Sequence, residues 1–90
     1  MKREDVEGTI KSMAYKYSKP HLIFKNYVRV GGLGCHFTVR FYKDAFTIKG
    51  IGDDGVKRIE CIFYEDVQKL AMFFSRLFII CENFDYYLDF

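Results

Sequence analysis

The stretch EDVQKLAMFFSRLFIICEN, residues Glu65–Asn83, is the most apolar run of the chain and decides the expected fold. Its apolar residues recur at intervals of three and four, which places side chains on one face of a helix. The residues with this spacing are Val67, Leu70, Ala71, Phe74, Leu77, Phe78 and Cys81. Glu65 and Asp66 suit a first turn, where carboxylates stabilise the positive end of the helix dipole. The sequence therefore predicts a long helix over residues 65–83.

The polar side of this predicted helix also carries apolar residues. Met72 and Ile79 lie one above the other in the polar arc, with Phe73 at its edge and Arg76 within it. Either the apolar residues pack under the N-terminal helix or the C-terminal tail, or they form a contact surface. Met72, Phe73, Arg76 and Ile79 are therefore the candidate surface for a protein partner or for a homodimer through the C-terminal helix.

The chain before this stretch reads as one helix and four strands. Residues 3–19 predict a helix that Pro20 ends. Four stretches then alternate between apolar and polar residues, as half-buried strands do. These stretches are 21–30, 35–42, 45–51 and 56–64. Short or glycine-rich turns at 31–34, 43–44 and 52–55 imply an antiparallel meander.

The expected fold is a single α+β domain over residues 1–90, with the long C-terminal helix packed on one face of the meander. In the last strand we expect Ile59, Cys61 and Phe63 to face the core, and Arg58 and Glu60 to face solvent. The tail, residues 84–90, either adds an edge strand or wraps the core, or it is an acidic-aromatic peptide that docks elsewhere.

Charge and cysteine content limit the class of protein. The net charge of +2 hides a basic segment 9–50, with eight cations against one carboxylate, and an acidic segment 51–90, with four cations against eight. The three cysteines show no paired spacing and are expected to be reduced. The charged start and the short apolar runs predict a protein without signal peptide or membrane span, in the cytoplasm of a bacterial cell.

Catalytic and metal-binding patterns are not apparent in the sequence. His21 and His36 have no HExxH spacing, and Cys35 and His36 are neighbours on opposite faces of a strand. Residues 53–55 begin like a calcium loop but lack the later ligands, so a turn is expected. We therefore expect a protein that is not an enzyme and that uses neither a metal nor a cofactor.

The solvent face of the predicted sheet is the main candidate binding site. Basic residues alternate there with aromatic ones, a pattern that can contact phosphates and stack bases. An ordinary solvated face is the alternative. The residues proposed for this site are Lys25, Tyr27, Arg29, His36, Arg40, Tyr42, Lys49 and Arg58.

Two families share parts of this pattern. The element order, with GGLGCHFTVRF at residues 31–41, resembles double-stranded-RNA-binding domains, but the last helix starts with Glu65 and Asp66 where that family has lysines, so this resemblance is rejected. Residues 57–77, about a quarter of the chain, resemble the last strand and helix of Whirly-like single-stranded-DNA-binding coactivator domains. That resemblance implies four strands and a helix that dimerise, and it concerns architecture rather than function.

Two functions fit these observations. The first is a small inhibitor or adaptor, of the kind that phages and mobile elements encode, that occludes a host nucleic-acid-handling protein, as anti-CRISPR-like proteins do. A charged patch would orient the partner, and aromatic anchors would supply affinity. The alternative is a single-stranded nucleic-acid-binding protein that uses the basic and aromatic sheet face.

Overall fold

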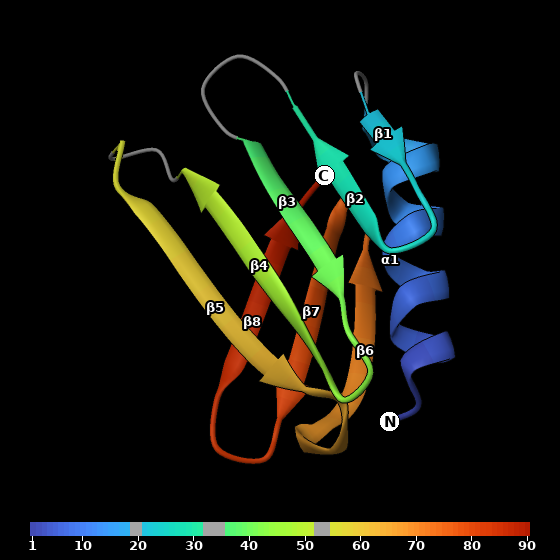
Figure 1. Ribbon diagram of the computed structural model, residues 1–90, viewed down its shortest axis with the longest axis vertical. Helices are drawn as coiled ribbons and strands as arrows, with labels where there is room; N and C mark the ends of the chain where they lie inside the picture. Colours follow the sequence, from blue (N-terminus) through green and yellow to red (C-terminus); the bar gives the residue numbers. More distant parts are fainter. Residues whose placement is uncertain (19–20, 32–35, 52–54) are drawn as a thin grey trace.

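The computed structural model describes residues 1–18, 21–31, 36–51 and 55–90, which form one α-helix and two antiparallel sheets (Figure 1). The elements are α1 (Arg3–Tyr17), β1 (His21–Ile23), β2 (Tyr27–Val30), β3 (His36–Phe41), β4 (Ala45–Ile51), β5 (Lys57–Phe63), the 3-10 helix η1 (Tyr64–Asp66), β6 (Val67–Phe73), β7 (Arg76–Cys81) and β8 (Asp85–Asp89). Strands β1 to β5 form a five-stranded sheet in chain order, and β6 to β8 form a three-stranded sheet in chain order. The expected helix stop at Pro20, the turns at 31–34 and 52–55 and Cys35 lie wholly or partly outside the described residues.

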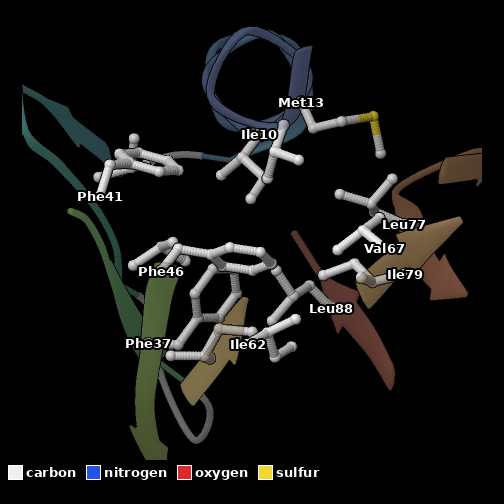
Figure 2. Packing of buried hydrophobic residues seen from close by; sticks show 14 of the residues in the cluster. Ile10, Met13, Phe37, Phe41, Phe46, Ile62, Val67, Leu77, Ile79 and Leu88 are labelled. Carbon is white, nitrogen blue, oxygen red and sulfur yellow. The ribbon is translucent and has the colours of Figure 1, made fainter. Parts of the chain in front are cut away.

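The hydrophobic core has three walls. Figure 2 shows α1 on one side, the five-stranded sheet on the second and the three-stranded sheet on the third. Ile10 and Met13 point inward from α1, Phe46 and Ile62 from the five-stranded sheet, and Leu77 from the three-stranded sheet. Neither sheet could bury its apolar face alone, so both sheets and the helix depend on one another.

The predicted fold is wrong in two places. Residues 21–30 form the hairpin of β1 and β2 rather than one strand, so the first sheet has five strands and not four. Residues 65–83 are not a helix. They form η1 and the hairpin of β6 and β7, which pairs Met72 with Leu77 and Leu70 with Ile79. Leu77, Ile79 and Cys81 are buried at alternate positions, which is the period of a strand. The resemblance to Whirly-like domains fails with the helix. The tail becomes β8, an edge strand, as one of the alternatives predicted.

The turn between β6 and β7 explains the error. Phe73 pairs with Arg76, so Phe74 and Ser75 form a two-residue turn. Phe74 has a φ of 52°, in the left-handed region where such turns usually place glycine or asparagine. A phenylalanine at this position gives no turn signal in the sequence, and the apolar run reads through it as one continuous helix.

The register of β5 also differs from the prediction. Phe46 pairs with Ile62 and Ile48 pairs with Glu60, so Ile62 is buried and Glu60 lies on the inner side. Ile59, 67 % exposed, Cys61 and Phe63 therefore face outward. The segment is apolar at both odd and even positions, so only the pairing with β4 decides which side faces the core.

Neither helix in the described part of the chain has the length and apolar character needed to span a bilayer.

Replacement of Phe74 by glycine tests the hairpin directly. Left-handed backbone costs a non-glycine residue about 1–2 kcal/mol, and glycine loses about 0.5–1 kcal/mol through its flexibility. We expect Phe74→Gly to raise the free energy of unfolding by about 0.5–1 kcal/mol in a denaturant titration.

Leu77→Ala is the control, because Leu77 is fully buried and its truncation should cost about 2–5 kcal/mol. A loss of about 1 kcal/mol or more on Phe74→Gly, as glycine causes inside a helix, would contradict the hairpin.

Candidate functional site

The side of the five-stranded sheet that faces away from the core is the candidate site, and we call it the outer face. The register predicted for β2, β3 and β4 is confirmed, since Val28, Val39 and Ile48 are buried between outward residues. The outward positions are Leu22, Tyr27, Arg29, His36, Thr38, Arg40, Tyr42, Ala45, Thr47, Lys49, Ile51, Lys57, Ile59, Cys61 and Phe63. In Figure 1 the three-stranded sheet lies behind β3 and β4, and α1 lies beside β1 and β2.

Strand pairing arranges Arg29, Arg40 and Lys49 in two neighbouring rows, and Lys57 lies beside them in register with Ile51. One row runs across the sheet through Leu22, Arg29, Thr38, Lys49 and Ile59. The next runs through Tyr27, Arg40, Thr47 and Cys61. Strand spacing of about 4.8 Å and a rise of about 3.4 Å per residue put neighbouring cations roughly 7–10 Å apart at the backbone.

Contacts within the face hold the two arginines. The Arg40 guanidinium lies 5.0 Å from the centroid of the Tyr27 ring, which in turn stacks on Phe24 at 4.6 Å. Arg29 Nε donates a long hydrogen bond of 3.5 Å to Thr38 Oγ1. Both side chains are exposed, so their remaining N–H donors can reach a ligand.

A third row supplies aromatic surface. Tyr42 N–H donates to the Ala45 carbonyl at 2.9 Å, and Ala45 pairs with Phe63. The small side chain of Ala45 therefore stands between two aromatic side chains that are each about half exposed. Such rings offer stacking surfaces for planar groups.

Two of the predicted residues do not belong to this face. Arg58 shares the inner side of β5 with Glu60 and Ile62, because the register of β5 is reversed. Lys25 lies in the loop between β1 and β2, and its carbonyl accepts a hydrogen bond from Lys11 Nζ at 3.0 Å. The same reversal brings Lys57 and Phe63 to the face, which is why the sequence alone did not reveal them.

The outer face differs in charge from the exposed face of the three-stranded sheet. None of the outward strand positions in the described five-stranded sheet is a carboxylate. On the three-stranded sheet, by contrast, Asp89 accepts two hydrogen bonds from Arg76, at 2.7 and 3.1 Å. The Arg76 guanidinium also covers the Tyr87 ring at 4.4 Å. The outer face therefore keeps its positive charge available for an anionic ligand.

The predicted partner surface takes a different form. Ile79 is fully buried, and Arg76 is paired with Asp89, so no helical surface joins them to Met72 and Phe73. Met72, Phe73 and Phe74 instead lie at the end of the β6–β7 hairpin with Ser75, a segment we call the hairpin tip. Their side chains are 62 %, 66 % and 75 % exposed, and the Phe73 and Phe74 rings meet edge to face at 4.8 Å.

A shallow depression between α1 and β1 is a weaker candidate. It is lined by Lys11, Ser12, Tyr15, Lys16 and His21. Lys11 Nζ is already paired with Glu7 at 2.9 Å, and the His21 ring contacts the Ser18 carbonyl. This depression therefore offers less unpaired charge than the outer face.

Within the described ranges, no three histidine, cysteine or acidic side chains come together as metal ligands. Comparisons with protein-family models, curated proteins and solved structures found no match to this chain.

The reactivity of the cysteines tests the register of β5. Cys61 is exposed, whereas Cys81 is 5 % exposed. Burial raises the pKa of the Cys81 thiol, and Asp66 and Asp85 raise it further, so less reactive thiolate forms near neutral pH. In the Cys35→Ser variant we expect a thiol reagent to label Cys61 more than an order of magnitude faster than Cys81, as measured by peptide mass spectrometry. Equal protection of the two cysteines would contradict the register.

Proposed function

We propose that this protein is a non-catalytic binding protein that holds single-stranded nucleic acid on the outer face. One observation carries the proposal: two cation rows and an aromatic row share an open sheet face whose described strands place no carboxylate outward. Positive side chains that follow a phosphate backbone, together with rings that stack bases, are the usual elements of single-strand binding. We place this activity in the cytoplasm of a bacterial cell.

Each row would have its own task. Arg29, Arg40, Lys49 and Lys57 would contact phosphates, and the guanidinium groups can each donate two parallel hydrogen bonds. Tyr42 and Phe63 would stack bases on either side of Ala45. Tyr27 lies between Phe24 and Arg40, so its task would be to orient the Arg40 guanidinium.

A second candidate function rests on the hairpin tip. Exposed aromatic residues are typical anchors of protein interfaces, and Phe73 and Phe74 are consecutive in the chain. Phe74 also has a left-handed backbone conformation, a kind of strain that is found at binding sites. This observation favours the inhibitor or adaptor, in which Phe73 and Phe74 would enter an apolar pocket of a host nucleic-acid-handling protein. The outer face would then orient an acidic partner.

Salt dependence and charge reversal test the first proposal. Four phosphate contacts predict a slope of about −2.8, or −0.7 for each contact, in a plot of log affinity against log salt for a single-stranded oligonucleotide. Arg29→Glu with Arg40→Glu should weaken binding roughly a hundred-fold or more, because hydrogen bonds to charged groups contribute about 1.5–3 kcal/mol each. The magnitude of the slope should fall by about 1.4.

The matched control is Lys2→Glu with Lys69→Glu, which makes the same change in net charge away from the outer face. Equal binding by the two double variants would rule out the face as the site.

Capture from bacterial lysate tests the second candidate. A protein partner should remain bound after nuclease treatment and should be lost from Phe73→Ser with Phe74→Ser, since the apolar anchors are removed. Tyr15→Ser with Tyr87→Ser is the control, because both tyrosines are exposed but lie elsewhere. A partner that is retained by the tip variant would exclude the tip as its anchor.

A further inference from the structure

Strand β5 is an edge of the five-stranded sheet whose backbone groups point in a known direction. Tyr64 N–H donates to the Asp44 carbonyl at 3.1 Å, so the even-numbered residues of β5 point their backbone groups at β4. By alternation, the N–H and C=O groups of Lys57, Ile59, Cys61 and Phe63 point away from the sheet. The strand is seven residues long and contains neither a proline nor a register shift.

The other three sheet edges are less suited to accept a strand. Strand β1 has three residues, and β6 has a register shift between Val67 and Lys69. Strand β8 has aspartates at both ends, which would oppose each other in a self-paired antiparallel arrangement. Short edges, bulges and like charges are the features that keep edge strands from pairing. β5 has the most open edge among the described strands.

β5 is also complementary to itself. When Cys61 is aligned with Cys61 of a second copy in antiparallel register, Ile59 of each copy lies opposite Phe63 of the other. These side chains are exposed in the single chain, and they would cover one another across the junction. Each strand starts with Lys57 and Arg58 and is followed by Glu65 and Asp66. Antiparallel pairing therefore brings the basic start of one copy toward the acidic end of the other.

We propose that β5 pairs with β5 of a second copy of this chain, so that the two five-stranded sheets become one continuous sheet in a two-fold symmetric dimer. The apolar strip of Ile59, Cys61 and Phe63 from both copies forms the centre of the joined outer face, with the cations of β2, β3 and β4 of each copy on either side. The dimer uses backbone hydrogen bonds and apolar contacts, so it does not depend on the proposed nucleic-acid binding.

Crosslinking through Cys61 tests whether the β5 strands of two copies pair. The Cys61 Cα atoms of the two copies would lie about 5.5 Å apart, and the buried Cys81 should not react. In Cys35→Ser we expect the shortest bis-maleimide linker to give a covalent dimer. The control moves the reactive thiol to the neighbouring strand β4 by combining Thr47→Cys with Cys35→Ser and Cys61→Ser. The Cα atoms of residue 47 in the two copies would lie about 15 Å apart. Equal crosslinking yields from both variants would overturn the proposal.

A proline at position 61 provides a second test. Cys61→Pro removes an N–H that makes no bond to β4, so the sheet should persist while pairing of the edge is blocked. Cys61→Val keeps the N–H. In sedimentation at about 1 mM protein, we expect dimers for wild type and Cys61→Val, and monomers with an unchanged circular dichroism spectrum for Cys61→Pro. A monomeric wild type, or a dimer of Cys61→Pro, would overturn the proposal. Oligonucleotide binding by the monomeric variant separates this inference from the proposed function.

Discussion

The pairing of Phe46 with Ile62 is the constraint on which the functional surface depends. Phe46 is fully buried and stacks on Tyr64 at 5.5 Å, while the Tyr64 hydroxyl donates to the Tyr42 carbonyl at 2.9 Å. Because side chains alternate along a strand, this anchoring turns Ile59, Cys61 and Phe63 outward. A shift of one residue would bury them and expose Ile62. The core thus selects which residues of β5 join the outer face and its edge.

The second sheet completes the core at the cost of a strained turn. β6, β7 and β8 supply Val67, Leu77, Ile79 and Leu88, which cover the inner side of the five-stranded sheet (Figure 2). The tight connection between β6 and β7 forces Phe74 into left-handed backbone. The same turn displays the most exposed apolar side chains of the hairpin tip, so stability and partner binding would place opposite demands on residue 74.

Local patterns predicted part of this structure, and tertiary pairing decided the rest. The helix α1 follows from its apolar stripe, and the outward positions of Arg29, Arg40 and Lys49 follow from clean alternation in β2, β3 and β4. The run from Val67 to Cys81 satisfies both the helical and the strand period, because Phe78 and Ile80 are apolar on the outward side as well. Lys57 and Phe63 were missed for a similar reason, since β5 is apolar at odd and even positions.

The outer face combines positively charged side chains, exposed aromatic residues and an unpaired strand edge. Proteins that bind single-stranded nucleic acid use the charged and the aromatic side chains together. An NMR titration with a short single-stranded oligonucleotide tests this most directly. We expect the largest chemical-shift changes at Arg29, Arg40, Tyr42 and Lys49, with the signals of Phe74 and Arg76 unmoved. Changes confined to the hairpin tip, or no change at a high oligonucleotide concentration, would contradict single-strand binding on the outer face.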